Sequence, residues 1–172
     1  MRSFLIACAL APACLLSAGA FAHVTLENQQ AVAGSTYKAI FRVGHGCGES
    51  PTIRIRVQIP DGVLSVTPQP KPGWQLETVK AKLATPVSNG HGGQITDAVR
   101  EVVWSGGKLP NDHYDEFVLR AALPDKPGTT IYFPVVQDCE QGANRWIEIP
   151  EAGKTIGDYK QPAAQLRLTP KP

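Results

Sequence analysis

A histidine follows directly after an export signal in this 172-residue chain. Ala20-Phe21-Ala22 is an A-x-A cleavage site, and its use would leave His23 as the first residue of the mature protein. The α-amine and imidazole Nδ1 of an N-terminal histidine can chelate one metal ion. The α-amine has a pKa of about 8, so a metal displaces its proton at small cost near neutral pH. Such nitrogens suit Cu(II), which favours tetragonal N and O ligands. The alternative is that cleavage leaves a histidine there by accident.

The first 22 residues follow the plan of a signal peptide. Arg2 supplies the positive charge, and residues 3–16 form an apolar stretch that is too short for a transmembrane helix. No second apolar run follows, so we expect an exported protein, periplasmic or secreted, without a membrane anchor. The 17 basic and 15 acidic residues nearly balance and form no basic block, which argues against nucleic acid as a partner.

Two cysteines, Cys47 and Cys139, remain after the signal is removed, since Cys8 and Cys14 leave with it. In an oxidising compartment an isolated pair predicts a disulfide. The competing interpretation is a thiolate metal site formed by His45, Cys47 and Cys139. It is the weaker one, because neither cysteine belongs to a C-x-x-C pair.

The elements that must position these residues are strands. Residues 52–59 place Ile53, Ile55, Val57 and Ile59 on one face and polar side chains on the other, which is typical of a half-buried strand. No segment has a helical period. The chain from residue 23 to 172 therefore predicts one all-β domain, an immunoglobulin-like or cupredoxin-like β-sandwich. The expected strands are residues 35–43, 52–59, 63–67, 73–83, 96–104, 115–123, 130–137 and 144–149, with an edge strand at 165–169 in a tail expected to fray from about residue 160.

Residues typical of an enzyme are not evident. The chain has no G-x-S-x-G elbow, no phosphate-binding glycine loop and no acid pair that suggests general acid–base catalysis. His91 and His113 fall in predicted loops, where a solvated role is the simplest interpretation. His45 lies in the glycine-rich loop of residues 44–48, which is flexible enough to bring a ligand near a metal, although most such loops only connect strands. We therefore expect no enzymatic activity.

Five motifs occur in a fixed order along the chain after residue 22. They are His23-Val24-Thr25-Leu26, Lys71-Pro72-Gly73-Trp74, Tyr114-Asp115-Glu116-Phe117, Phe133-Pro134-Val135-Val136-Gln137 and Arg145-Trp146-Ile147-Glu148. This ordered set resembles the YcnI-like family of bacterial exported copper-binding domains. The resemblance covers most of the chain after residue 22, and it rests on the ordered set rather than on one motif.

The resemblance implies a β-sandwich that binds Cu(II) through a brace made by one N-terminal histidine, with an acidic side chain and a tryptophan nearby. Carried over to this chain, the brace is His23, the tryptophan is Trp146 and the carboxylate is Glu116, with Glu27 and Asp115 as reserves. Glu116 has the parity opposite to Phe117, so the site would have to lie at a strand end or on the other face of that sheet.

The function that we expect is that of a copper carrier or metallochaperone, which would exchange copper with other exported copper-handling proteins. Two alternatives stay open. One is a copper-dependent oxidative enzyme, in which a second histidine (His45, His91 or His113) completes the brace. The other is a structural sandwich without a metal.

Overall fold

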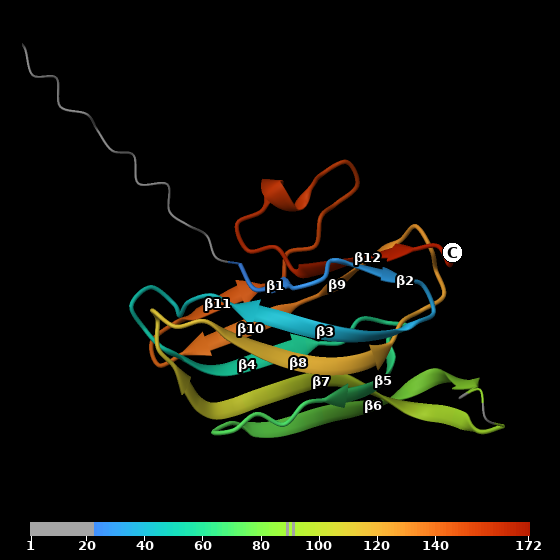
Figure 1. Ribbon diagram of the computed structural model, residues 1–172, viewed down its shortest axis with the longest axis horizontal. Coiled ribbons are helices and arrows are strands. Elements are labelled where there is room, and N and C mark those ends of the chain that lie inside the picture. The colour runs from blue at the N-terminus through green and yellow to red at the C-terminus, as the bar shows by residue number, and fades with distance from the viewer. Residues whose placement is uncertain (1–22, 89, 91) are drawn as a thin grey trace, which may run out of the picture.

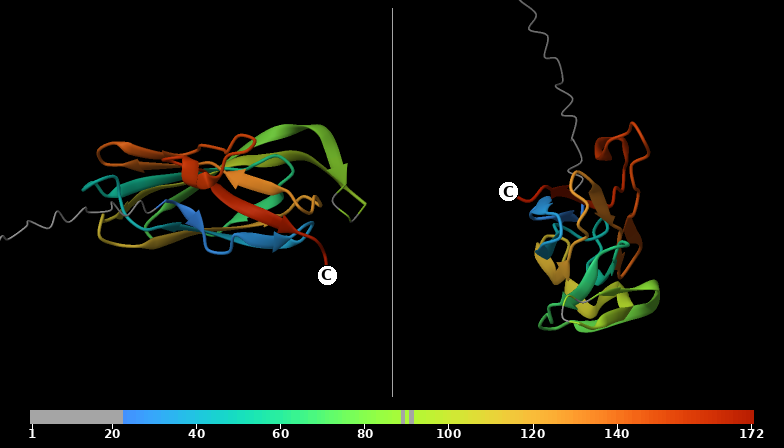
Figure 2. Two further views of the ribbon diagram at one scale, coloured as in Figure 1. Left: turned by 90° about the horizontal axis from the view of Figure 1, so that it is seen from above. Right: turned by 90° about the vertical axis from the view of Figure 1, so that its right-hand side faces the viewer.

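The computed structural model describes residues 23–88, 90 and 92–172. Two main β-sheets lie face to face (Figures 1 and 2). The first has the strand order β1-β3-β8-β5 and the second the order β11-β10-β4-β7-β6. A third sheet, β2-β12-β9, joins them along one side, because β2 follows β1 in the chain and β9 precedes β10. The prediction of an all-β sandwich is confirmed. The strands are β1 (Thr25–Leu26), β2 (Gln30–Val32), β3 (Thr36–Val43), β4 (Thr52–Gln58), β5 (Leu64–Pro68), β6 (Gln75–Ser88), β7 (Gln94–Leu109), β8 (Asp115–Ala122), β9 (Thr130–Phe133), β10 (Val135–Cys139), β11 (Ala143–Trp146) and β12 (Ala164–Thr169), and a short 3-10 helix, η1, spans Ile156–Asp158.

The core lies between the two main sheets and follows the period-2 pattern of the sequence. In β3, Phe41 is fully buried while Arg42 is exposed, and in β8 Phe117 is buried while Arg120 is exposed. Strands β3 and β8 pair in antiparallel register, with Phe41 opposite Phe117 and Arg42 opposite Glu116. The apolar positions of the two strands therefore face the core together, and their polar positions share the outer face.

One expected strand, residues 130–137, is divided in the structure. Pro134 interrupts it, so that β9 pairs with β12 and β10 pairs with β4 and β11. Proline has no N–H to donate to a strand ladder and is therefore found where pairing stops or changes. The chain crosses from one sheet to another at this residue, which delivers β10 and β11 to the second main sheet.

The C-terminal tail departs from the prediction in two ways. Strand β12 exists, but it is the middle strand of its sheet and not an edge strand, since it pairs with both β2 and β9. Its side chains Leu166 and Leu168 are fully buried. The prediction that the tail frays from about residue 160 is therefore wrong, because burial of two leucines holds it against the domain.

Strands β6 and β7 form a long hairpin, part of which extends beyond the sandwich (Figure 1). At the far end of this hairpin, Ser88 of β6 pairs with Gln94 of β7. His91 and the signal peptide predicted for residues 1–22 lie outside the described residues.

Candidate functional site

The first described residue, His23, lies against a tryptophan from the other end of the chain. The His23 and Trp146 rings meet edge to face, with centroids 5.2 Å apart and an interplanar angle of 74°. Strand β1 starts two residues after His23 at one edge of the first sheet, and β11 forms one edge of the second sheet and ends at Trp146. The two edges thus bring together the two residues that the resemblance assigned to the site.

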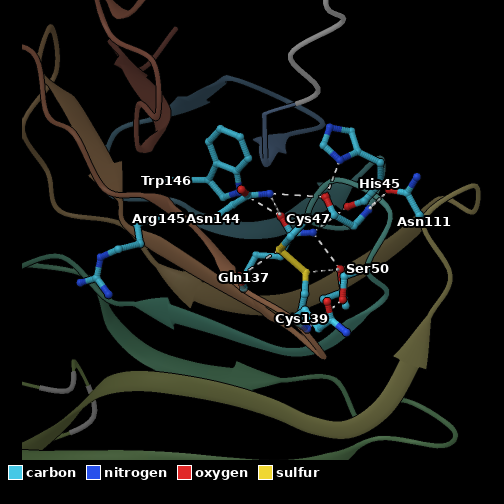
Figure 3. The surroundings of a disulfide bond; sticks show 12 residues. His45, Cys47, Ser50, Asn111, Gln137, Cys139, Asn144, Arg145 and Trp146 are labelled. Carbon is cyan, nitrogen blue, oxygen red and sulfur yellow. Dashed lines mark hydrogen bonds between the residues drawn. A yellow bond between two sulfur atoms is a disulfide. The ribbon is translucent and has the colours of Figure 1, made fainter.

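Trp146 is held by a buried glutamine on the neighbouring strand. Its Nε1 donates a hydrogen bond of 3.1 Å to Oε1 of Gln137, which is 1% exposed. The Gln137 Nε2 donates to the His45 carbonyl at 2.6 Å and to the Thr52 hydroxyl at 2.8 Å. Asn144 donates a longer bond of 3.4 Å to the same Gln137 oxygen. Every hydrogen-bonding position of the Gln137 amide is occupied, so the indole, the 44–50 loop and β4 are linked through one side chain (Figure 3).

The predicted disulfide joins Cys47 to Cys139, with an S–S distance of 2.12 Å and a Cα–Cα distance of 6.0 Å. It ties the loop after β3 to the end of β10, next to the Gln137 network (Figure 3). The competing thiolate site at His45, Cys47 and Cys139 does not fit this state, because both sulfurs are consumed by the bridge. The disulfide agrees with an oxidising compartment.

The expected carboxylate, Glu116, lies away from His23. It is on the outer face of the first sheet, opposite Arg42, which in turn lies opposite Thr25 of β1. With adjacent strands about 4.8 Å apart, Glu116 is separated from Thr25 by about 10 Å across β3. The Tyr114 hydroxyl donates a hydrogen bond to Glu116, and this bond raises the pKa of Tyr114. Glu116 lies on the face of the sheet opposite to Phe117, as the alternation of side chains along the strand predicted.

The two reserve carboxylates have cationic partners. Asp115 accepts a hydrogen bond from Lys71 Nζ at 2.6 Å. Glu27 is paired with Arg42 at 3.1 Å on the exposed face. Within residues 23–88, 90 and 92–172, no three His, Cys, Asp or Glu side chains converge as a metal-binding group.

The remaining histidines differ in their surroundings. His113 is exposed and belongs to a turn in which its N–H bonds to the Pro110 carbonyl. His45 is half-buried, and its Nδ1 lies 2.5 Å from the Gly46 carbonyl oxygen. His45 is therefore the more buried of the two, and its ring has a hydrogen-bond partner.

Sequence reasoning did not identify Gln137 or Asn144 as parts of this site. A signal was present for Gln137, because a glutamine within the apolar run Val135-Val136-Gln137 must find hydrogen-bond partners if the strand is buried. The identity of those partners depends on the register of β10 with β4 and β11, which one sequence does not provide.

No helix among the described residues is long and apolar enough to cross a membrane.

Comparison with known proteins agrees with this architecture. A solved structure, described as an uncharacterized protein from Nocardia farcinica with an immunoglobulin-like fold, is similar to this chain with a TM-score of 0.63 and 26% sequence identity, over 86% of this chain and 98% of that one. The fold is thus an immunoglobulin-like sandwich. No curated protein matches the sequence. A family model described as a domain of unknown function (DUF1775) matches residues 23–168, and the chain belongs to that family.

Proposed function

We propose that this protein is an exported Cu(II) carrier that binds its cargo through the α-amino group and imidazole Nδ1 of His23. The observation that carries the proposal is the contact between the His23 and Trp146 rings. A terminal residue normally moves freely. Here the adjoining residues Val24 and Leu26 are each only 2% exposed, so the start of the domain is anchored beside the indole.

Trp146 would limit access of water to one side of the ion. The indole is 4% exposed, and its orientation is fixed by Gln137. An apolar wall beside a metal controls solvent access and the local dielectric, and a hydrogen-bonded wall keeps its position while the metal enters or leaves. The resemblance to YcnI-like domains supports the same two residues from a separate argument.

The residues of the domain fit Cu(II) better than Cu(I). The one methionine of the chain is Met1, and Cys8 and Cys14 also precede His23. Cys47 and Cys139 are bridged. The form that begins at His23 therefore has no thiol or thioether to offer, whereas Cu(I) prefers these soft ligands. Reduction of the bound Cu(II) by a one-electron donor outside the protein would favour its transfer to a partner with sulfur ligands, and the protein would act as a carrier without catalytic activity.

The carboxylate implied by the resemblance stays a prediction, because Glu116 is bonded to Tyr114 and lies across β3 from β1. The replacement Glu116→Gln tests it. Weaker Cu(II) binding would mean that this side chain turns to the ion. Unchanged affinity and spectrum would remove Glu116 from the site and make Asp115 and Glu27 the next residues to test.

The main experiment compares the chain that begins at His23 with the same chain carrying one extra glycine before it. Cu(II) affinity is measured by competition with a chelator, and the ligand set by electron paramagnetic resonance. We expect the extension and His23→Ala to abolish tight binding and the exposed-histidine control His113→Ala to have no effect. Equal affinity with and without the glycine would overturn the proposal. Copper-dependent substrate oxidation would favour the enzyme alternative. If the unchanged chain that begins at His23 bound no Cu(II), the result would favour the metal-free sandwich.

A further inference from the structure

We infer that His45 supplies a third nitrogen to the copper site through its Nε2 atom, so that the ion is held by two histidines rather than one. This inference rests on the proposed function. It concerns a ligand other than the carboxylates of Glu27, Asp115 and Glu116, each of which contacts another side chain.

The pairing of β1 with β3 places both histidines at the same end of this strand pair. Leu26 lies opposite Phe41 and Thr25 opposite Arg42. His23 comes two residues before the start of β1, and His45 comes two residues after the end of the antiparallel strand β3. The two histidines therefore lie at the same end of one strand pair, although they are far apart in the sequence.

The tautomer of His45 leaves Nε2 available as a ligand. A carbonyl oxygen can only accept a hydrogen bond, so the 2.5 Å contact between His45 Nδ1 and Gly46 O requires the proton on Nδ1. The lone pair is then on Nε2. Metal-binding histidines usually have this arrangement, in which the other ring nitrogen donates to a carbonyl or carboxylate and fixes the ring. Figure 3 shows the His45 imidazole directed away from the disulfide, on the side where β1 begins.

The loop that carries His45 is held at several points, despite its three glycines. The His45 carbonyl accepts a bond from Gln137, the Gly46 N–H donates to Asn111 at 3.0 Å, and Cys47 is bonded to Cys139. A Cβ at Gly46 would lie 2.0 Å from the Ser50 carbonyl oxygen, so the close turn requires glycine. A loop fixed before the metal arrives loses little conformational entropy on binding.

Gln137 connects the two sides of the inferred site. One end of its amide bonds to the His45 backbone and the other to the Trp146 indole, and the indole contacts His23. His23 contributes two nitrogens by itself, its α-amine and its imidazole Nδ1, so that His23 and His45 together give three nitrogens from two residues. Such a set needs no third His, Cys, Asp or Glu, in keeping with the absence of a group of three among the described residues. It would leave one equatorial position of a tetragonal Cu(II) site for water or an anion.

The test uses the chain that begins at His23 and the variants His45→Ala, His23→Ala and His113→Ala, with Cu(II) as the probe. We expect His45→Ala to reduce affinity by at least roughly the 10- to 100-fold that loss of an outer-shell partner costs. We also expect the nitrogen hyperfine pattern to change from three nitrogens to two. His113→Ala should match the unchanged protein in both measurements.

A measurement on the unchanged protein guards against misfolding of the variant. In a histidine-labelled sample, substoichiometric Cu(II) should broaden the ring resonances of His23 and His45 equally and leave those of His113 sharp. Full affinity and an unchanged hyperfine pattern in His45→Ala, or a sharp His45 signal, would overturn the inference while His23 remained essential. Tight binding that survives His23→Ala would instead overturn the proposed function.

Discussion

Replacement of Gln137 by leucine should weaken the domain more than any other single polar-to-apolar change near the site. The substitution nearly conserves volume but removes the bonds to Trp146 Nε1, the His45 carbonyl and the Thr52 hydroxyl. Both Trp146 and Thr52 are buried, so these groups lose their partner without gaining water. Asn144 is half-buried and can turn to solvent, and its longer bond adds little.

The magnitude follows from the two buried groups, the Trp146 indole and the Thr52 hydroxyl, that lose this partner. A buried polar group left unsatisfied costs about 1–3 kcal/mol, so the low end for two groups gives about 2 kcal/mol in the free energy of unfolding. Urea unfolding, followed by tryptophan fluorescence and by circular dichroism, measures this quantity. The control is Gln141→Leu, since Gln141 is exposed. A loss below about 1 kcal/mol for Gln137→Leu would refute the view that this amide organises the site.

Three further predictions concern stability. Replacement of both Cys47 and Cys139 by serine should lower the free energy of unfolding by about 4 kcal/mol, because the disulfide closes a long loop and limits the entropy of the unfolded chain. In the unchanged protein that begins at His23, thiol titration after unfolding without reduction should find no free thiol. Burial first, and then Glu27, raises the pKa of Tyr37 to about 12. The folded state thus favours the neutral phenol. Its contribution to the free energy of unfolding is present below pH 10 and is lost as the pH rises from 10 to 12, by about 3 kcal/mol at 1.36 kcal/mol per pH unit. In urea unfolding, a Tyr37→Phe variant should lack this part of the decrease in stability at alkaline pH. Gly107→Ala should cost about 1–3 kcal/mol by the same measurement, because its Cβ would lie 2.2 Å from the Trp74 ring.

Much of the fold could be predicted because its strands have alternating burial. The pattern of β3, β4 and β8 in the sequence is the pattern of their side chains in the core. The disulfide was predictable from compartment and cysteine count. The division at Pro134 and the central place of β12 were not, since both depend on which strands become neighbours. A proline was visible in the sequence, but nothing local distinguishes a bulge from a change of sheet.

In the candidate site, too, short motifs identified individual residues, but the positions of these residues depend on which strands pair. His23 and Trp146 were named from motifs, and the structure brings them into contact. Glu116 was named from a motif as well, but the register of β3 with β8 places it beside Arg42 and Tyr114. His45 was assigned to a loop and given little weight. The role that we infer for it depends on the pairing of β1 with β3, which brings His23 and His45 to the same end of that strand pair.

The position of the site at the end of a sandwich has a physical reason. An N-terminal α-amino group can serve as a ligand only where the chain begins, and a chain end is ordinarily mobile. Strand β1 spans two residues, and burial of Val24 and Leu26 at about 1.5–3 kcal/mol each is sufficient to hold the residue that precedes it. Since β1 is an edge strand, His23 stays near solvent while its ring rests on Trp146. Under the proposed function, a terminus anchored in this way would offer ligands in a fixed place without enclosing the ion, which suits delivery to another protein.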